Sequence, residues 1–507
     1  MGNKEEFIQH IKEGYTSKGD HIYMGAAMLD GQPIPEARIQ IPLRTLNRHG
    51  LIAGATGTGK TKTLQILAEN LSEKGIPVLL MDIKGDLSGI AKAAEENEKL
   101  NNRHRVLDFK FTPQASPVEI LSLSEQPGVK LKATVSEFGP VLLSRILNLT
   151  DTQTGILGII FQYCDNNHLP LLDLKDLKKI LQYATEEGKE EFEKDYGRIA
   201  KASTGAILRN IVSLEQQGGE RFFGEPSFEV YDLTRKTADG KGYVNILRLN
   251  DIQDKPKLFS TFMISLLAEV YSEFPEKGDV DKPELILFID EAHLIFKEAS
   301  GALMDQLESI IKLIRSKGIG IYFVTQNPTD VPAEILSQLG LKIQHSLRAF
   351  TAKDRKAIKL TAENYPLSKY YDTKEVLTAL GIGEALISAL DDKGRPTPLA
   401  ATMLRAPMSR MDILTRDEIK ELTDSSTLAA KYSKDIDRES AYELLDAKIT
   451  RAEKEDARSK AKKERETVTR TTTRKGKSQR QNPVVKVLTS ATFIRGVMSI
   501  LNKSFKK

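Results

Sequence analysis

The sequence predicts an α/β protein with a mostly parallel β-sheet, and three features of the chain support this class. Apolar, β-branched runs bounded by turn residues recur along the chain, as strands require. Helical periodicity fills several intervals between these runs, for example at Met304, Leu307, Ile311 and Ile314. A glycine-rich segment also joins one apolar run to one periodic segment. Strands that alternate with helices favour a parallel sheet that is covered on both faces.

Each element is predicted from its own local pattern. The expected strands are Gly50–Gly54, Val78–Asp82, Val244–Leu249, Leu285–Asp290, Ile319–Thr325, Ile343–Arg348 and Ala385–Leu390. After Pro483, apolar residues recur at the spacing of one amphipathic helix. Shifts in pattern and charge predict five parts: the N-terminal part of the core (1–120), a mainly α-helical insertion (121–240), the C-terminal part of the core (241–410), a charged helical linker (411–480) and an amphipathic C-terminal helix (481–507).

Composition and charge exclude several classes of protein. No run of 18 or more apolar residues exists, and the N-terminus lacks the apolar core of a signal peptide, so no integral membrane association is expected. The single cysteine, Cys164, excludes an internal disulfide framework, and these features together predict a cytoplasmic protein. Residues 451–507 carry 17 Lys and Arg against 5 Asp and Glu, whereas residues 1–450 carry 57 against 65. The basic surplus belongs to this tail, residues 451–507, which we expect to be dispensable for the fold but to attract polyanions, a protein partner or another subunit.

The strongest motif is "HGLIAGATGTGKTKTLQILAENL". Its residues fit the pattern G-x-x-x-x-G-K-[ST], which follows an apolar strand and opens a periodic helix. Glycines allow backbone N–H groups to converge on phosphate oxygens, and the helix directs its positive end toward them. Lys60 would reach the β- and γ-phosphates, and the Thr61 hydroxyl would bind Mg²⁺. The motif predicts a site for ATP and Mg²⁺ made by Gly54, Ala55, Thr56, Gly57, Thr58, Gly59, Lys60, Thr61 and Lys62.

A second motif, "LILFIDEAH", delivers Asp290 and Glu291 at the end of an apolar strand, the edge where ligands bind in such sheets. Asp290 would hold the Mg²⁺ shell through water, and Glu291 would orient and deprotonate the attacking water. The alternative is a surface acidic pair that caps the next helix. Gln326 follows the apolar strand "IGIYFVT", which we expect beside the strand of Asp290, so its amide would sense the γ-phosphate. The alternative there is a glutamine that stabilises the following turn.

The letters D-E-A-H name a large group of helicases, but the spacing excludes that group. Asp290 follows Lys60 by 230 residues, far more than those helicases use. Their S-A-T motif follows the acidic box closely, whereas Ser490-Ala491-Thr492 lies 200 residues later. The guanine-reading N-K-x-D motif and the kinase signatures are also absent from the sequence. These observations fit a single RecA-like P-loop core with a large insertion between its two nucleotide motifs.

Five stretches of the chain carry a resemblance to a known family. They are "RHGLIAGATGTGKTKTLQ", "MDIKGDLSG", "KPELILFIDEAHLIF", "IGIYFVTQNPTDVP" and "IQHSLRAFTAKDRKAI". Together they resemble the HerA–FtsK superfamily and, within it, the stand-alone bacterial HerA-like ATPases of the YjgR type. The resemblance implies a ring ATPase, usually hexameric, that couples ATP hydrolysis to movement of DNA through a central pore. HerA proper carries an N-terminal β-barrel that meets its nuclease partner, but few residues precede the P-loop here, so a nuclease partner is not implied.

The resemblance also suggests a role for Arg315, which we expect to act as an arginine finger on the ATP of a neighbouring subunit. It lies 25 residues after Asp290, one step beyond the apolar face of the preceding helix, at a position similar to the finger of FtsK-type motors. A guanidinium suits this task because it is always charged and can bind γ-phosphate oxygens with two donors. The alternative is an arginine that interacts with carbonyl groups at the helix end. Arg348 and Arg395 are the reserve candidates.

Two functions remain open at this point. The leading hypothesis is an ATP-hydrolysing ring motor that translocates or unwinds DNA, and the alternative is an ATP-regulated assembly or remodelling protein that does not track along DNA. The sequence holds no helix-turn-helix, zinc-ligand cluster or RNP motif, so sequence-specific recognition of DNA is not expected. It also holds no tryptophan, so extensive stacking on bases is not expected. Contacts with DNA would be made to phosphates, through the tail or through Lys84, Lys201 and Arg209, each of which could instead be an ordinary surface charge.

Overall fold

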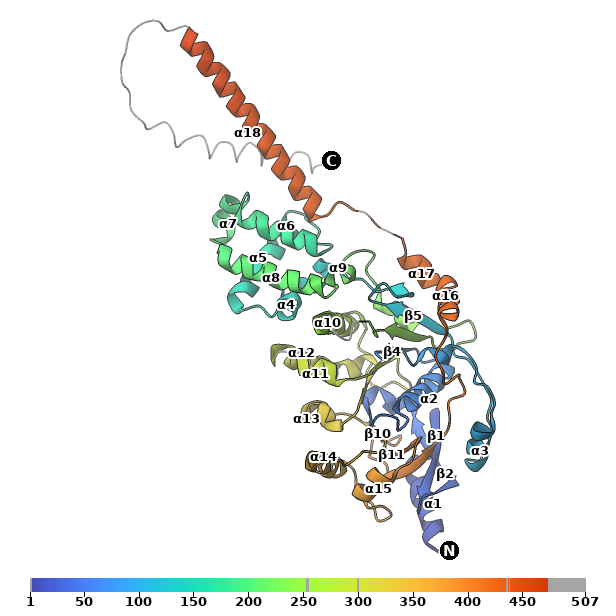
Figure 1. Cartoon of the computed structure of the whole chain (residues 1–507). Coiled ribbons are helices and arrows are strands. Elements are labelled where there is room, and N and C mark those ends of the chain that lie inside the picture. Colours follow the sequence, from blue (N-terminus) through green and yellow to red (C-terminus); the bar gives the residue numbers. More distant parts are fainter. Residues whose placement is uncertain (1, 252–254, 299–300, 435, 437, 473–507) are drawn as a thin grey trace.

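One large sheet organises the chain (Figure 1). The structure is a computed structural model that describes residues 2–251, 255–298, 301–434, 436 and 438–472. Among these residues, twelve strands form a mixed sheet in the order β2-β1-β12-β11-β10-β3-β9-β8-β4-β7-β5-β6. Neighbouring strands from β10 to β6 pair in parallel, and those from β10 to β2 pair antiparallel. The predicted α/β class and the mostly parallel sheet are confirmed.

Strands and helices alternate along most of the chain. The strands are β1 (His21–Leu29), β2 (Gln32–Pro42), β3 (Gly50–Ala53), β4 (Val78–Asp82), β5 (Val118–Ser122), β6 (Val129–Lys130), β7 (Val244–Arg248), β8 (Leu285–Ile289), β9 (Ile319–Thr325), β10 (Leu341–Gln344), β11 (Glu384–Ser388) and β12 (Ala400–Leu404). The α-helices are α1 (Gly2–Tyr15), α2 (Lys60–Glu73), α3 (Glu98–Val106), α4 (Val135–Ile146), α5 (Asp151–Asn166), α6 (Leu174–Thr185), α7 (Lys189–Tyr196), α8 (Lys201–Gln216), α9 (Gly219–Phe222), α10 (Pro256–Glu273), α11 (His293–Glu298), α12 (Gly301–Ile314), α13 (Ala333–Leu336), α14 (Ala352–Glu363), α15 (Thr373–Ala379), α16 (Arg416–Asp424), α17 (Thr427–Tyr432) and α18 (Ala441–Thr472).

Most predicted strands lie close to where the sequence indicated, but the prediction of Ile343–Arg348 was wrong in its limits. Strand β10 begins earlier, at Leu341, and ends at Gln344. Beyond Gln344 the backbone turns to the loop that follows β3, where the Ala55 N–H donates to the Ser346 carbonyl over 2.9 Å. His345 and Ser346 therefore support that loop instead of extending the sheet.

The sequence reasoning missed five strands, β1, β2, β5, β6 and β12. A detectable signal existed for the first two, because Asp30 and Gly31 form a two-residue turn between them with φ of 51° and 75°. Positive φ at both positions is typical of the tight turns that Asp-Gly pairs favour in hairpins. No such local signal marks β12, which joins this hairpin to β11 by antiparallel pairing on both of its sides.

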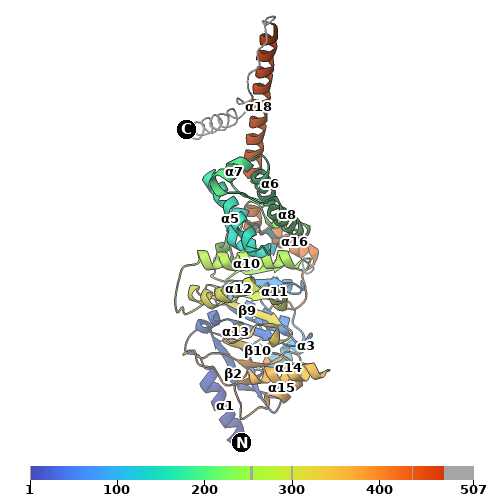
Figure 2. The ribbon, with the colours of Figure 1, turned by 90° about the vertical axis from the view of Figure 1, so that its left-hand side faces the viewer.

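Helices cover both faces of the parallel part of the sheet, and β8 illustrates why its sequence is continuously apolar. Leu287 and Ile289 belong to the core that includes α10 and α12, whereas Ile286 and Phe288 belong to the core that includes α1 and α2. Figure 2 shows α10, α11, α12, α13 and α14 stacked along one of these faces. A central strand buried on both faces needs apolar side chains at every position, since successive residues point to opposite sides.

A block of helices, α4–α9, lies at the end of the sheet that carries β5 (Figure 1). These helices fall within the segment predicted as a helical insertion, and strand β6 lies in the same segment. The division of the chain into five parts stays a prediction. Helix α18 begins against α6 and α7, where Lys179 pairs with Asp446 over 2.9 Å and Lys448 pairs with Glu191 over 3.0 Å. Its remaining length extends away from the body.

Part of the predicted C-terminal organisation can be compared with the structure. The segment predicted as a charged helical linker contains α16, α17 and α18. The amphipathic helix predicted for residues 481–507 lies outside the described residues. None of the described helices combines the length and the hydropathy needed to cross a bilayer.

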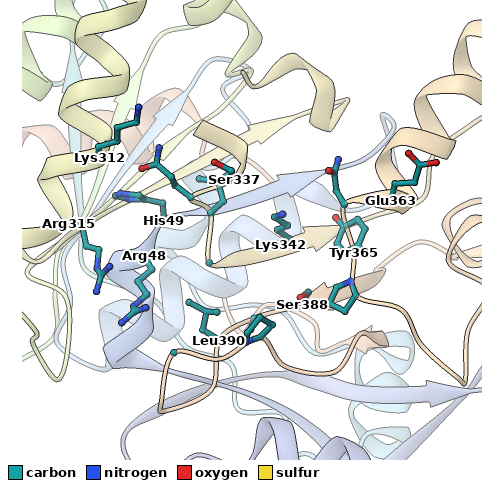
Figure 3. Close-up of a pocket in the computed structure, with 18 residues that line it drawn as sticks. Arg48, His49, Lys312, Arg315, Ser337, Lys342, Glu363, Tyr365, Ser388 and Leu390 are labelled. Atoms are coloured by element: carbon teal, nitrogen blue, oxygen red, sulfur yellow. The ribbon is translucent and has the colours of Figure 1, made fainter. Parts of the chain in front are cut away.

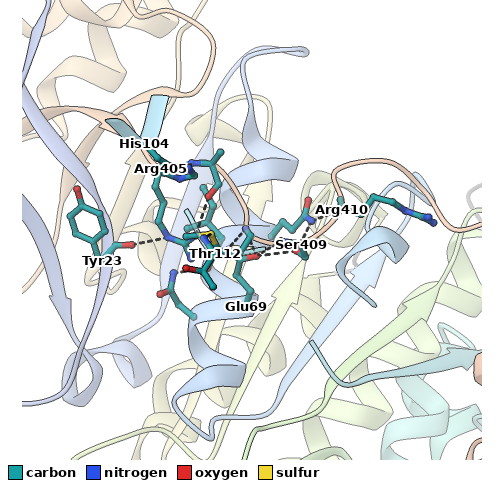
Figure 4. A network of polar contacts seen from close by, with 12 residues as sticks. Tyr23, Glu69, His104, Thr112, Arg405, Ser409 and Arg410 are labelled. Atoms are coloured by element: carbon teal, nitrogen blue, oxygen red, sulfur yellow. Dashed lines mark hydrogen bonds and ion pairs between the residues drawn. The ribbon is translucent and has the colours of Figure 1, made fainter. Parts of the chain in front are cut away.

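A buried ion pair fastens the helix α2 to the chain segment that follows β12 (Figure 4). Nη1 of Arg405 lies 2.6 Å from Oε1 of Glu69, and both side chains are less than a tenth exposed. The Glu69 carboxylate also accepts the backbone N–H groups of Met408 and Ser409, over 3.0 Å and 3.2 Å. Arg405 in turn donates from Nε to the Tyr23 carbonyl of β1 over 3.3 Å. The network therefore joins α2, β1 and the residues after β12.

Replacing Arg405 by Met is expected to lower the free energy of unfolding by about 3 kcal/mol, because the Glu69 carboxylate would stay buried without its counter-charge. Chemical denaturation measures this change. Lys420→Met is the control, since both side chains of the Lys420–Asp424 pair are more than half exposed and an exposed pair contributes about 1 kcal/mol or less. Equal losses for the two variants would contradict the special role of the buried pair.

Candidate active site

The glycine-rich loop between β3 and α2, residues 54–59, is built around glycine conformations. Gly54, Gly57 and Gly59 have φ of 151°, 80° and 113°, values that disfavour residues with a Cβ atom. A Cβ at Gly54 would lie 2.5 Å from Cβ of His345, so a side chain there would also collide with the segment after β10. The Gly54 N–H donates to the Thr325 carbonyl at the end of β9 over 3.3 Å. Strands on both sides of β3 thus hold this loop, which is called the phosphate-binding loop below after the role that its motif predicts.

Lys60 opens α2 and turns back into the loop. Its Nζ donates to the carbonyl of Gly54 over 2.6 Å and to that of Ala55 over 3.1 Å. Burial lowers the pKa of Lys60, as does the nearby charge of Lys84, although Glu291 and Asp290 act in the opposite direction. The ammonium is therefore held inside the loop and close to the acidic pair, as the motif predicts for a phosphate-binding lysine.

The acidic pair lies directly after β8, at the same edge of the sheet. Asp290 is buried, and this burial raises its pKa to about 6 despite the charge of Lys84. Its Oδ1 accepts the Glu291 N–H over 2.9 Å. Glu291 has φ of 45°, a left-handed conformation that is uncommon for a residue other than glycine and recurs at functional sites. The conformation and the burial argue against a simple helix cap.

The Glu291 carboxylate has two chemically different oxygens. Oε1 lies 2.7 Å from Nζ of Lys84. Oε2 lies 3.2 Å from Nδ1 of His293, yet it is buried and accepts no hydrogen bond from any residue that the structure describes. Burial acts to raise the pKa of Glu291, but the hydrogen bond and charge of Lys84 hold it below the usual value. The group is thus a carboxylate whose Oε1 pairs with Lys84, while its Oε2 lies near His293 without a hydrogen bond among the described residues.

Sequence reasoning missed Asp86 and misjudged the surroundings of Lys84, both in the loop after β4. The Asp82 carboxylate accepts the N–H groups of Gly85, Asp86 and Leu87 over 2.7, 3.1 and 3.2 Å, which fixes this loop. Oδ2 of Asp86 accepts the Thr61 hydroxyl over 3.2 Å, and its Oδ1 is buried without a partner among the described residues. Lys84, considered above as a DNA contact, instead pairs with Glu291.

Gln326 follows β9, which lies between β3 and β8. The expectation that its strand lies beside the strand of Asp290 is confirmed, because β8 and β9 pair in parallel. Gln326 is exposed at the carboxyl edge, between the phosphate-binding loop and the acidic pair. The turn after it is held without its help, since Asp330 accepts the Thr325 hydroxyl and the Asn327 N–H over 2.7 and 3.2 Å.

Arg315 lies far from this site within one chain, because η4 (Arg315–Lys317) precedes β9 and so belongs to the amino edge of the sheet. Its side chain is 41% exposed, and Nη2 lies 3.5 Å from Oδ1 of Asp279. Figure 3 shows Arg315 next to Arg48 at a cavity of about 590 Å³. Burial lowers the pKa of Arg48, and the positive charge of Arg315 adds to the effect. Any action of Arg315 on ATP requires a second subunit.

The reserve arginines occupy different surroundings. Arg348 is exposed beyond the carboxyl end of β10, on the side of the phosphate-binding loop. Arg395 pairs with Asp391, with 2.7 Å between Nη2 and Oδ2. An arginine already neutralised by a carboxylate four residues away is a weaker candidate for phosphate than Arg315, whose contact with Asp279 is long and exposed.

A protein-family model described as "Helicase HerA-like C-terminal" matches residues 28–507. The chain belongs to the HerA-like family. This membership confirms the family predicted from the five quoted stretches, whereas the narrower resemblance to the YjgR type stays a prediction.

Individual relatives of this HerA-like chain carry names that refer to DNA. It is 27% identical over 360 residues to the DNA double-strand break repair helicase HerA of Sulfurisphaera tokodaii, covering 69% of this chain and 64% of the relative. It is 24% identical over 401 residues to the DNA import protein CedB of Sulfolobus acidocaldarius, covering 78% and 57%. The chain therefore spans less than two thirds of the length of these curated relatives.

Solved structures support the fold of this HerA-like chain. The unbound bacterial conjugative coupling protein TrwBdeltaN70 superposes with a TM-score of 0.52 at 14% identity, over 80% of this chain and 94% of that one. The plasmid coupling protein TrwB in complex with the non-hydrolysable ATP analogue ADPNP gives a TM-score of 0.50 at 13% identity, over 79% and 99%. At such low identity the likeness concerns the fold alone.

Replacing Gln326 by Ala in this HerA-like chain is expected to slow ATP turnover about 10²-fold with little change in ATP binding, because one donor to the reacting groups would be lost. Phosphate release and nucleotide binding measure the two effects. Asn327→Ala is the matched control, since Asn327 lies next in the chain and caps η5 (Pro328–Asp330). If Gln326→Ala retains the wild-type rate, or loses no more than Asn327→Ala, the proposed sensor role fails.

Proposed function

We propose that this chain is the subunit of an ATP-hydrolysing ring motor that translocates or unwinds DNA. The observation that carries the ATPase proposal is the Glu291 carboxylate, which is buried at the edge of the sheet that also carries Lys60 and Asp290 and whose Oε2 accepts no hydrogen bond among the described residues. A carboxylate kept ionised by Lys84, with one oxygen that accepts no hydrogen bond from the described residues beside a phosphate-binding loop, suits a general base for the attacking water. Membership of the HerA-like family and the names of its relatives support DNA as the track.

Each residue of the site has a proposed task in hydrolysis. The backbone N–H groups of the phosphate-binding loop would bind the β-phosphate, and Lys60 would neutralise charge on the β- and γ-phosphates. Glu291 would take the proton of the attacking water through Oε2, while Gln326 would orient that water. The leaving ADP would depart with its charge balanced by Lys60.

The residues around Thr61 fit a bound Mg²⁺. Thr61 donates to Oδ2 of Asp86, whose Oδ1 is buried without a partner among the described residues, and Asp290 is buried at the same edge of the sheet. Oxygen donors of this kind are those that Mg²⁺ prefers, and the ion usually completes its shell with water and substrate phosphates. When bound, Mg²⁺ would neutralise the charge that develops on the transferred phosphate.

The ring assembly is proposed from the position of Arg315. The arginine lies at the amino edge of the sheet and the phosphate-binding loop at the carboxyl edge, so a ring in which opposite edges of neighbouring subunits meet would bring the two together. The HerA–FtsK resemblance makes six subunits the favoured number. A cytoplasmic location, predicted from the sequence, stays a prediction.

Phosphate contacts are proposed for DNA binding. Lys201 and Arg209 are exposed on α8, so both are available to a strand. Lys84 is less suitable than the sequence suggested, because its ammonium pairs with Glu291. The tail adds the densest positive charge of the chain, and a protein partner or a neighbouring subunit could use the same surface.

The proposal is tested by ATP turnover of the purified chain without DNA, with single-stranded DNA and with double-stranded DNA, together with the mass of the particle by light scattering. We expect turnover that DNA stimulates several-fold and a mass of six chains. Lys60→Ala provides the background rate. Turnover that neither DNA form changes, combined with an assembly state that ATP alters, would favour the assembly or remodelling protein instead.

Removing residues 451–507 is expected to weaken DNA binding and to flatten its salt dependence, while the DNA-independent ATPase rate is kept. The tail holds 17 Lys and Arg, and each phosphate contact that is lost reduces the slope of log affinity against log salt. Fluorescence anisotropy at several salt concentrations measures this slope. A shorter truncation, which removes residues 473–507, preserves α18. Comparing the two truncations separates the contribution of residues 451–472 to DNA binding from that of residues 473–507. Unchanged DNA binding, assembly and partner capture in both truncations would contradict a role for the tail.

A further inference from the structure

A short loop, Gly381–Gly383, joins α15 to β11 and contacts the phosphate-binding loop. The Gly383 N–H donates to the Thr58 carbonyl over 3.1 Å. Nη2 of Arg103 donates to the Gly383 carbonyl over 2.6 Å. The Gly381 N–H donates to the Glu384 carboxylate over 2.7 Å. Hydrogen bonds at both ends therefore hold this loop in place beside the residues that would receive the phosphates.

Ile382, at the centre of this loop, presents its side chain to solvent. It is 78% exposed, and glycines flank it on both sides. A single exposed apolar side chain needs no explanation by itself. This one, however, is held by a backbone that is fastened to the phosphate-binding loop, so its position relative to a bound nucleotide is defined.

The order of the strands indicates the side on which the nucleoside lies. In the sequence β11-β10-β3-β9-β8, the acidic pair after β8 lies on one side of β3, and the loop before β11 lies on the other. Because β11 runs antiparallel to β10, its first residue is at the carboxyl edge of the parallel strands, where ligands bind. With the γ-phosphate directed to Glu291, the α-phosphate and the nucleoside leave the loop on the opposite side, toward Ile382.

We propose that Ile382 forms an apolar platform for the base of the nucleotide bound at the phosphate-binding loop. The inference rests on the proposed function, since it assigns the base end of the same ATP. An isoleucine side chain offers contact area to the planar face of a base but neither donates nor accepts a hydrogen bond. It therefore contributes affinity for a purine nucleotide without selecting adenine over guanine.

Calorimetry measures the affinity of the chain for two probes in the presence of Mg²⁺. ADPNP carries the base and the phosphates, whereas inorganic tripolyphosphate carries only the phosphates. Ile382→Ser is expected to weaken ADPNP binding about tenfold, the effect of losing part of one buried apolar side chain. Tripolyphosphate binding should not change, and Ile382→Leu should keep most of the ADPNP affinity. Leu367→Ser is the matched control, because Leu367 is fully exposed and follows Pro366, which lines the cavity at the opposite edge of the sheet.

Two results would overturn the platform while leaving the ATPase proposal intact. One is wild-type affinity of Ile382→Ser for ADPNP. The other is an equal loss for both probes, which would mean that the loop only supports the phosphate-binding residues. If the wild-type chain binds neither probe better than Lys60→Ala does, the proposed function fails and the platform fails with it.

Discussion

Replacing Glu291 by Gln is expected to leave ATP bound while slowing its hydrolysis by about 10²- to 10⁴-fold, the usual contribution of a general base. The amide preserves the shape of the side chain but cannot take a proton from water. Lys60→Ala should instead abolish both binding and turnover, because the buried ammonium would no longer neutralise phosphate charge. Binding of ADPNP and release of phosphate distinguish the two variants.

The control for Glu291 uses the other end of the same strand. Glu284 lies one residue before β8, at the amino edge, where it pairs with Lys277 over 2.8 Å. Glu284→Gln should therefore retain the wild-type rate. A Glu291→Gln protein that hydrolyses ATP as fast as the wild type would remove the assigned base.

Replacing Arg315 by Ala is expected to lower the hydrolysis rate by about 10³- to 10⁵-fold, with ATP binding largely kept, because arginine fingers stabilise charge in the transition state. Within one chain, Arg315 lies at the edge of the sheet opposite to the phosphate-binding loop. The lower hydrolysis rate would therefore come from the loss of a contact between Arg315 of one subunit and the ATP of its neighbour. Lys312→Ala is the control, since Lys312 lines the same cavity and precedes Arg315 by one turn of α12.

Mixed rings test this action between subunits directly. Arg315→Ala and Glu291→Gln are each expected to be inactive alone, and the two proteins are combined under conditions that exchange subunits. Some interfaces then pair an intact Glu291 with an intact Arg315, so part of the turnover should return. No recovery in rings proven to be mixed, or near-normal turnover by Arg315→Ala alone, would exclude the finger.

The limits of sequence-based prediction are visible at three places in this chain. The limits of strand β10 were misjudged because no Gly or Pro after Gln344 marks its end, and only its neighbour β3 determines where the pairing ends. Asp86 was missed because nothing in its local sequence marks it as a partner of Thr61. Lys84 was interpreted as a DNA contact or an ordinary surface charge because its partner, Glu291, lies more than two hundred residues later in the chain.

The sequence by itself determined the phosphate-binding loop, the strand that ends in Asp290 and Glu291, and the alternation of helices with a mostly parallel sheet. These features depend on interactions between residues close in the chain: glycine torsions, apolar periodicity and the start of a helix. Only the tertiary structure decided that Lys84 meets Glu291, that Arg405 meets Glu69, and that Arg315 lies at the opposite edge from the loop. Such contacts depend on the order in which strands pair, and the free energy of that pairing comes from burial across the whole sheet and not from any local pattern.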